Sequence, residues 1–171
     1  MDSSKRKNKE FIVAYDQYAD GLFRHCYFKV SNRELALDLV QETFTKAWHS
    51  IVKGQEVANI KSFLYKIANN LIIDEYRKKK HLSLDELRSD GFDIAGADHH
   101  TITAPAEIHI VLASVEKLED KYREVIQMRY LSDLSPREIA EILGETENAV
   151  SVRINRALKQ MRDLLNTNEQ E

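Results

Sequence analysis

The C-terminal third of the chain carries side chains whose types and spacing suit contact with a nucleic acid. Residues 151–162 contain four basic residues and no acidic residue. On a helix, one face of this region would present amide, hydroxyl and guanidinium groups, which can pair with base edges and phosphate oxygens. That face consists of Asn148, Ser151, Val152, Arg153, Asn155, Arg156 and Lys159, and the opposite, apolar face of Val150, Ile154, Ala157, Leu158 and Met161. The pattern predicts a helix that is buried on one side and fits the major groove of DNA with the other.

The segment in front of that helix has the signals of a helix-turn-helix. Ser135 can cap a helix that begins at Pro136, and Glu138, three residues after the cap, completes a capping box. Gly144 can adopt the left-handed conformation that ends this helix. Thr146 can then cap the next helix, which is the predicted reading helix.

Position along the reading helix decides the expected contact, because the N-terminal part of such a helix meets the bases. The expected base-reading residues are Asn148, Ser151, Val152 and Asn155. The expected phosphate contacts are Arg137, Arg153 and Lys159, and Arg156 suits either a guanine or a phosphate. The alternative is a plain helical hairpin whose basic face is only solvated.

An acidic stripe is predicted on a helix over residues 34–51. The polar residues on this stripe are Glu34, Asp38, Gln41, Glu42, Thr45 and His49, and they lie opposite Leu37, Val40, Phe44, Ala47, Trp48 and Ile51. Three of the acids are spaced by four, so they repel one another by a few tenths of a kcal/mol per pair. A basic protein partner would explain the stripe, but a solvated acidic face explains it too, and periodicity alone favours that reading.

A basic surface is predicted at the end of a helix over residues 60–80. Lys66, Asn69, Asn70, Asp74 and Arg77 lie away from its apolar stripe, and Lys78 to Lys80 follow. Amide groups can hydrogen-bond an exposed base while lysines hold phosphates. The alternative is a solubilising lysine cluster, which the helix dipole favours at a C-terminus.

The elements that position these residues are predicted to be helices. The chain has 171 residues, of which 43% are hydrophobic and 31% charged, and only five glycines and two prolines. So few turn-forming residues disfavour an all-β fold. Helical periodicity covers residues 11–30, 34–51, 60–80, the region from 107 and residues 122–131. The prediction is an all-α fold with two small helical domains at residues 8–80 and 107–166, joined by an acidic linker at 81–106 that holds one helical turn near Leu84 to Leu87.

The net charge of −3 hides an asymmetry along the chain. Residues 1–80 carry five more basic than acidic residues, whereas residues 81–110 and 111–171 carry an acidic excess of five and three. Two short basic stretches in an acidic molecule indicate two local DNA contacts and weak DNA binding by the chain alone, because affinity scales with the phosphates neutralised.

Several classes of protein are not supported by the sequence. No apolar run is long enough to span a membrane, and no signal peptide is apparent. The single cysteine, Cys26, cannot form an internal disulfide and is expected in the core of a protein in a reducing cytoplasm. No glycine-rich phosphate loop, nucleophile elbow or His-Glu-x-x-His pair is found, so we expect no enzyme, no cofactor and no small-molecule substrate. His99, His100 and His109 lie near Asp98, but such a cluster without cysteine support is more often incidental than a metal site.

Three segments together resemble the extracytoplasmic-function (ECF) group of the sigma-70 family, the promoter-specificity subunits of bacterial RNA polymerase. Residues 36–48 (ALDLVQETFTKAW) resemble the segment that binds core polymerase. Residues 63–77 (FLYKIANNLIIDEYR) resemble the helix that recognises and melts the −10 element, and residues 134–158 resemble the helix-turn-helix that reads the −35 element.

The resemblance implies roles for particular residues. The candidates for core-polymerase binding are Asp38, Gln41, Glu42, Phe44 and Trp48, although the last two also fall on the apolar stripe. The candidates for the −10 element are Lys66, Asn69, Asn70, Asp74, Arg77 and Lys78, and the loop at residues 53–59 would help to capture a flipped base. The implied partners are the clamp and flap regions of core polymerase, duplex promoter DNA, the −10 single strand and an anti-sigma protein. The implied location is the cytoplasm, on the nucleoid when active, without membrane insertion.

The chain departs from the family pattern in places. The family often has Leu-Pro where Leu118 and Glu119 stand, a small polar residue at Val152, and Gly-Thr at Asn148 and Ala149. The −35 sequence therefore cannot be carried over from the family. A stand-alone helix-turn-helix regulator with an N-terminal sensor or dimerisation domain is the main alternative, and a metal-dependent enzyme or histidine-linked sensor is a third.

Overall fold

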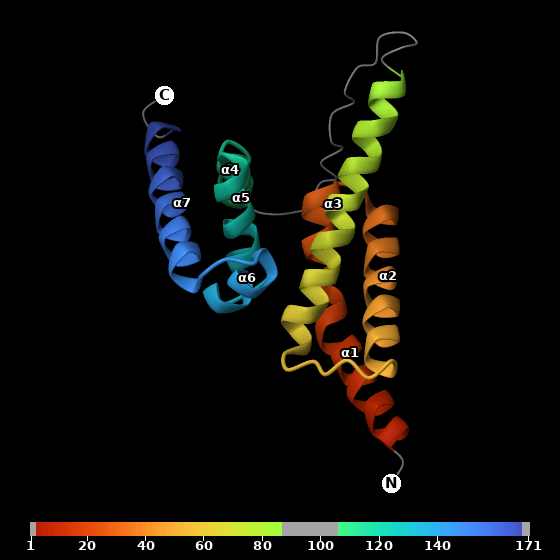
Figure 1. The fold of residues 1–171 in the computed structure, drawn as a ribbon. Coiled ribbons are helices and arrows are strands. Elements are labelled where there is room, and N and C mark those ends of the chain that lie inside the picture. Colours follow the sequence, from red (N-terminus) through yellow and green to blue (C-terminus); the bar gives the residue numbers. More distant parts are fainter. Residues whose placement is uncertain (1–2, 87–105, 169–171) are drawn as a thin grey trace. The chain divides into compact units, whose positions relative to one another are not determined.

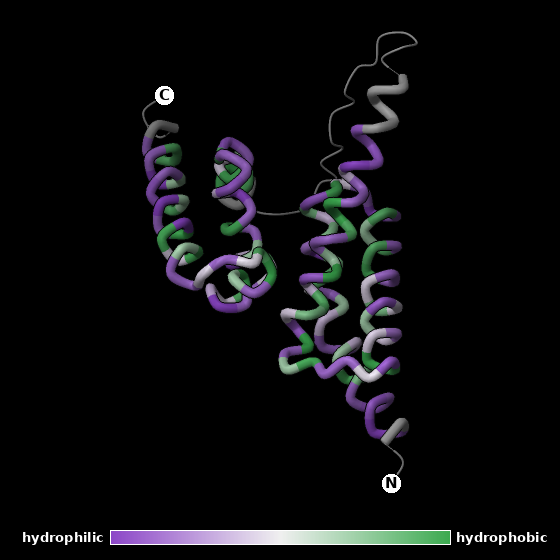
Figure 2. Tube along the Cα trace, in the orientation of Figure 1, coloured by the Kyte–Doolittle hydropathy of each residue, from purple (hydrophilic) through white to green (hydrophobic). Residues whose placement is uncertain are grey.

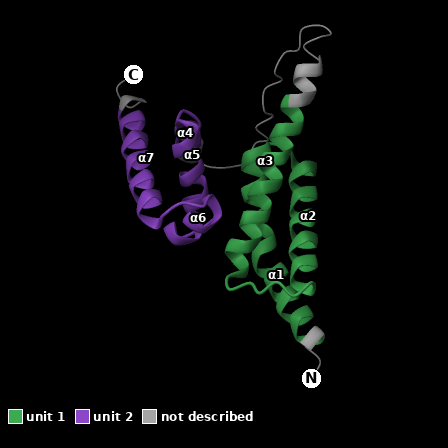
Figure 3. Cartoon of the chain, viewed as in Figure 1, with its two compact units in different colours: residues 1–99 green, residues 100–171 purple. Residues whose placement is uncertain are grey.

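The structure is a computed structural model that describes residues 3–86 and 106–168, and every regular element within these residues is a helix (Figure 1). The predicted all-α class is confirmed. The chain divides into two compact units, residues 1–99 and 100–171 (Figure 3). The predicted domain boundaries and linker stay a prediction, except that the helix expected to end near Lys80 continues to Glu86.

The N-terminal unit is a bundle of three helices, α1 (Ser3–Val30), α2 (Arg33–Val52) and α3 (Ile60–Glu86), each of which contacts the other two. Hydrophobic and hydrophilic residues alternate along each helix at helical spacing (Figure 2). The apolar stripes meet in a core that contains Leu22, Cys26, Ala36, Leu39, Ala47, Leu64, Tyr65, Ala68 and Ile72. Burial raises the pKa of the Cys26 thiol to about 12, as expected for a core residue.

Local sequence signals set the ends of the helices in this unit. The Asn32 side chain accepts a hydrogen bond from the backbone N–H of Leu35 at 2.9 Å and so caps α2. The start of α1 lies earlier than the predicted Phe11, because residues 3–10 continue the helix. Here an Arg6–Glu10 ion pair of 2.9 Å adds a little support, and the Lys7 ammonium donates to the carbonyl of Ile51 at 3.5 Å in the last turn of α2.

One close approach in the core requires a glycine. A Cβ atom at Gly21 would lie 2.7 Å from the hydroxyl of Tyr65, which is buried on α3. The absence of a side chain at Gly21 therefore lets α1 and α3 pack at this point.

The C-terminal unit contains α4 (Ala106–Glu116), α5 (Asp120–Ile126), the π-helical turn η1 (Gln127–Leu131), α6 (Pro136–Leu143) and α7 (Glu147–Asn168). The continuous helix expected over residues 122–131 is thus wrong in detail, because its second half is a π-helix. Helix α7 contacts α4, α5 and α6, and its residues Val150, Ile154 and Ala157 are buried in the core of the unit. The Arg123 guanidinium donates to the carbonyls of Glu116 and Leu118 at 2.7 and 2.8 Å, which fixes the corner between α4 and α5.

The predicted helix-turn-helix signals are all present in α6 and α7. Ser135 Oγ accepts from the N–H of Glu138 at 3.2 Å, and the Glu138 carboxylate accepts from the N–H of Ser135 at 2.8 Å. Gly144 has φ +70° at the end of α6, and Thr146 Oγ1 accepts from the N–H of Ala149 at 3.2 Å. The turn between α6 and α7 is therefore set by bonds that the local sequence encodes.

We expect the Ser135→Ala substitution to destabilise the C-terminal unit by about 1 kcal/mol, because it leaves a helix N-terminal N–H without its side-chain partner. Chemical denaturation followed by circular dichroism measures this change. Ser151→Ala is the matched control, since Ser151 lies inside α7 and caps nothing. An equal loss of stability in both variants would contradict the capping role.

The stability of the N-terminal unit is expected to depend on pH through His25, which is 2% exposed and packs edge-on against Tyr65. Burial, and to a lesser extent the charge of Lys29, lowers the pKa of His25 from 6.5 to about 3. The unfolded chain therefore binds a proton in a pH range where the folded chain does not. The free energy of unfolding should therefore have its full value above pH 6.5 and should decline as the pH falls below 6.5.

The test is the free energy of unfolding of His25→Leu between about pH 7.5 and 5.5, a range in which most carboxylates stay ionised. This variant should lose the decline that wild type shows, whatever its absolute stability. His49→Leu, which changes an exposed histidine on α2, should keep the decline. A decline of the same size in His25→Leu would contradict the assignment.

Candidate nucleic-acid and partner interfaces

The predicted reading face lies on the exposed side of α7. Asn148, Val152, Asn155, Arg156 and Lys159 are exposed there, and Ser151 and Arg153 are partly exposed. Arg137, on α6, is exposed as well and pairs with Glu141 at 3.6 Å. All eight predicted −35 residues therefore have some access to solvent on α6 and α7.

Arg153 differs from its neighbours on this face because it is already paired. Its guanidinium binds the carboxylate of Glu145, a residue of the turn between α6 and α7, and only 24% of the Arg153 side chain is exposed. This ion pair joins the turn to the reading helix. The geometry therefore favours a positioning role for Arg153 over the predicted phosphate contact.

On α3, five of the six residues predicted for the −10 element lie at the surface. These are Lys66, Asn70, Asp74, Arg77 and Lys78. Asn69 is 5% exposed, and its side-chain oxygen accepts a hydrogen bond from the Lys29 ammonium at 2.9 Å. Asn69 thus joins α3 to α1 inside the unit. Ile73 and Tyr76 on the same helix were not predicted at this surface, because apolar residues on a helix are expected in the core, yet they are 40% and 52% exposed.

The loop at residues 53–59, predicted to help capture a base, connects α2 to α3. Its second residue, Gly54, has φ +95°, a conformation that favours glycine, and at its end the Asn59 side chain accepts from the N–H of Ser62 at 3.1 Å. Val57 is half-buried, whereas the other residues of the loop are exposed. Polar backbone and side-chain groups of the loop are thus accessible next to the first turn of α3.

The acidic stripe on α2 borders an apolar groove. Asp38, Gln41 and Glu42 are exposed, whereas Phe44 is 5% exposed and Trp48 is half-buried. The ring centroid of Phe11 on α1 lies 5.9 Å from that of Phe44 and 5.1 Å from that of Trp48. The groove has a volume of about 700 Å³ and is lined by Asn8, Phe11, Ile12, Tyr15, Leu37, Val40, Gln41, Phe44, Thr45 and Trp48.

Leu37, on the predicted apolar stripe of α2, is 48% exposed at this groove, and Ile12 and Tyr15 are 61% and 50% exposed beside it. Leu37 is exposed because α1 covers only part of that stripe. An exposed apolar surface next to acidic residues is typical of a docking site for another protein.

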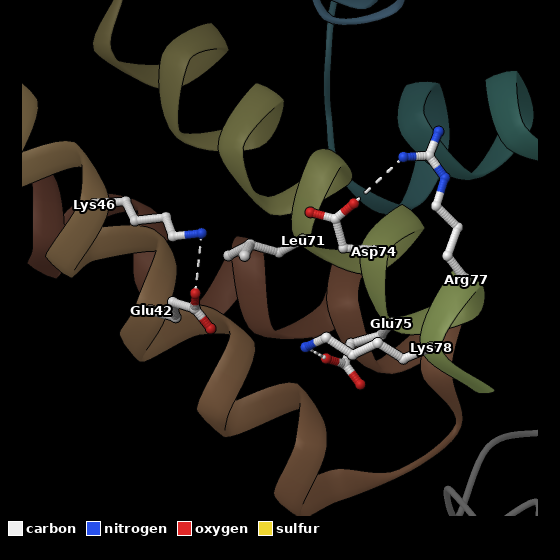
Figure 4. A pocket seen from close by; sticks show the side chains of 7 residues that line it. All are labelled: Glu42, Lys46, Leu71, Asp74, Glu75, Arg77 and Lys78. Carbon is white, nitrogen blue, oxygen red and sulfur yellow. Dashed lines mark hydrogen bonds and ion pairs between the residues drawn. The ribbon is translucent and has the colours of Figure 1, made fainter. Parts of the chain in front are cut away.

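A second pocket, of about 580 Å³, joins the acidic stripe to the basic end of α3 (Figure 4). Glu42 and Lys46 come from α2, and Leu71, Asp74, Glu75, Arg77 and Lys78 come from α3. Three ion pairs lie here, Lys46–Glu42 at 3.0 Å, Arg77–Asp74 at 3.5 Å and Lys78–Glu75 at 2.7 Å. Glu75 raises the pKa of Lys78 through its hydrogen bond and charge, with a smaller contribution from Glu42.

These ion pairs are exposed, so each contributes little to stability. A phosphate that approaches Arg77 or Lys78 competes with the carboxylates of Asp74 and Glu75. The basic end of α3 is therefore chemically suited to a phosphate backbone, but its positive charge is partly neutralised by the carboxylates of Asp74 and Glu75 on the same helix.

The described residues hold no group of histidine, cysteine or carboxylate side chains that could bind a metal ion. The predicted cluster of His99, His100 and His109 lies outside the residues whose side chains are described. No helix in the described part of the chain is long and apolar enough to cross a membrane.

Comparison with known proteins gives matches to both units. The family model for sigma-70 region 2 matches residues 14–82, and the model for sigma-70 region 4 matches residues 108–161. RNA polymerase sigma factor SigV of Bacillus subtilis is 34% identical over 160 residues, covering 92% of this chain and 93% of the relative. ECF RNA polymerase sigma factor SigW of the same organism is also 34% identical, covering 90% of each chain.

Two solved structures share the fold. The sigma factor RpoE from Bartonella quintana, solved with the anti-sigma factor NepR, has a TM-score of 0.72 and 23% identity, covering 92% of this chain and 98% of that chain. CnrH, solved with the cytosolic domain of CnrY, has a TM-score of 0.67 and 24% identity, covering 94% and 90%.

Proposed function

Since the chain belongs to the extracytoplasmic-function group of the sigma-70 family of RNA polymerase sigma factors, we propose how its particular surfaces divide the work of transcription initiation. The chain is a sigma factor that directs core RNA polymerase to promoters. The proposal assigns the −35 element to α7, the −10 element to α3, and core polymerase to α2 and its groove.

The observation that carries the proposal is the exposed polar face of α7 behind a capped glycine turn. Asn148, Val152 and Asn155 are exposed near the start of the helix, where a reading helix meets base edges. Arg156 and Lys159 follow within the next two turns of α7, where the helix is expected to pass the phosphates at the edge of the major groove. We propose that Arg153 acts mainly by holding the turn through Glu145.

For the −10 element we propose contacts from the exposed members of the predicted set, Lys66, Asn70, Asp74, Arg77 and Lys78. Asn69 supports them by fixing α3 to Lys29 on α1. Amide groups suit an unstacked base and cations suit the backbone. The exposed loop at residues 53–59 is proposed to hold such a base, which offsets part of the cost of opening the duplex.

For core polymerase we propose that Asp38, Gln41 and Glu42 meet a basic surface of the clamp while the neighbouring groove receives apolar side chains. Phe44 and Trp48 form the floor of the groove and hold its shape, and the contacts with polymerase come from the more exposed residues. The acidic stripe slightly destabilises the free protein, because like charges four residues apart on a helix repel one another. A cationic partner turns the same charges into a favourable surface. Ile110, Val111 and Tyr130, all at least 43% exposed, are proposed for the flap.

We also propose how this chain stands with respect to catalysis, location and regulation. Sigma factors take part in transcription without being enzymes themselves, and we propose that this chain has no catalytic activity, with the polymerase performing the chemistry. We propose a cytoplasmic location, on the nucleoid during initiation. The sigma factor RpoE of related fold was solved with the anti-sigma factor NepR, which supports regulation of this chain by such a protein. The alternative of a stand-alone regulator is not retained, because sigma-70 region 2 matches residues 14–82.

We expect the double reversal Asp38→Lys with Glu42→Lys to abolish run-off transcription by reconstituted holoenzyme. Like charges at a protein interface cost several kcal/mol, so binding to core polymerase should weaken by at least about tenfold. Asp16→Lys with Asp20→Lys is the matched control, because it makes the same charge change at the same spacing on α1, away from the groove. Equal activity of the two double variants would argue against the docking face.

The phosphate contacts can be tested by salt dependence. In holoenzyme, Arg156→Ala and Lys159→Ala should each lower the slope of log affinity against log salt by about one unit, since each removes about one neutralised phosphate. Lys117→Ala, an exposed lysine outside α6 and α7, should leave the slope unchanged. An unchanged slope in Arg156→Ala or Lys159→Ala would remove that residue from the phosphate contacts.

A further inference from the structure

One residue on the reading face of α7 has a chemistry that the others lack. Val152 is 41% exposed, and among the described residues of α7 it is the one large apolar side chain that is exposed. Asn148 lies four residues before it, and Asn155 and Arg156 lie three and four after it, so all three are its neighbours on the helix surface. The isopropyl group therefore stands in the middle of a polar face, not at the border of the core.

The position of Val152 limits what it can recognise. An isopropyl group neither donates nor accepts hydrogen bonds, and the base-edge feature of the major groove that suits it is the 5-methyl group of thymine. Against a purine, the same group would remove water from N7 without replacing its hydrogen bond, which is unfavourable. Contact with the thymine methyl group and exclusion of purines therefore both favour thymine at the position that Val152 meets.

The side chain is also well prepared for such a contact. Valine is β-branched, so its χ1 angle is strongly restricted on a helix and little conformational entropy is lost on binding. Its backbone is held by α7, whose opposite residues Val150 and Ile154 are buried at 0% and 7% exposure. The reading helix therefore presents the isopropyl group at a fixed place.

We propose that Val152 selects a thymine at one position of the −35 element by packing against its 5-methyl group. The inference rests on the proposed placement of α7 in the major groove. It adds a base preference, set by the one large apolar side chain exposed on the reading face.

The test uses a promoter that the reconstituted holoenzyme selects from a genomic library. Each thymine of the −35 element, on both strands, is replaced in turn by deoxyuridine, which lacks only the methyl group. Equilibrium binding of each promoter is measured with wild type, Val152→Ala and Val13→Ala at one salt concentration. Val13 is the matched control, because it is an exposed valine on α1 that does not line the groove.

With wild type, deoxyuridine at one position should weaken binding about fourfold, the factor that burial of one methyl group supports. Val13→Ala should show the same loss. Val152→Ala should bind the thymine and deoxyuridine promoters equally, since the partner of the methyl group is gone. Because Val152 is exposed, this variant should fold, and its circular dichroism checks that it does.

The inference is overturned if wild type tolerates deoxyuridine at every −35 position, or if the loss at the sensitive position persists undiminished in Val152→Ala. Both outcomes leave the proposed function intact, provided that wild-type holoenzyme initiates from this promoter and fails when the −35 element is scrambled. If wild type does not distinguish the scrambled promoter, the placement of α7 itself is wrong.

Discussion

Burial of one apolar stripe per helix is the interaction on which both units depend. Each unit is small, and every helix contributes to the core of its own unit, through residues such as Leu22 and Leu64 in the N-terminal unit and Val150 in the C-terminal unit. Because a helix that buries one side must expose the other, the packing that stabilises the fold also fixes which side chains face a partner. The polar faces of α2, α3 and α7 are therefore held by cores made from the opposite sides of the same helices.

Ion pairs within the chain modify these polar faces. Arg77 and Lys78 lie beside Asp74 and Glu75, and Arg153 is bound by Glu145. A phosphate must compete with these carboxylates, and the cost is modest where the pairs are exposed. The arrangement is consistent with weak DNA binding by the chain alone. It fits a protein whose two DNA contacts become effective when a larger enzyme holds both of them, since tethering raises the effective concentration of each.

Much of the fold followed from local patterns. The capping box of Ser135 and Glu138, the left-handed Gly144 and the cap at Thr146 were predicted because each depends on residues within a few positions of one another. The predictions failed where distant residues decide. Asn69 is buried, and Lys29 on α1, forty residues away, donates a hydrogen bond to its side chain. Leu37, on the apolar stripe of α2, is exposed because α1 leaves that part of α2 uncovered. The π-helical turn at residues 127–131 has no signal in the spacing of apolar residues.

The sequence by itself determined the all-α class, the caps of the helix-turn-helix, the division into two units and the family, because these rest on periodicity, short-range hydrogen bonds and motifs in series. Only the tertiary structure decided which members of each predicted site reach the surface. It brought Phe11 of α1 onto Phe44 and Trp48 of α2, and it placed Glu42 beside the basic end of α3. The physical reason is that the exposure of a side chain depends on how neighbouring helices cover one another. The residue pattern of a single helix does not indicate how much of its surface the neighbouring helices leave exposed.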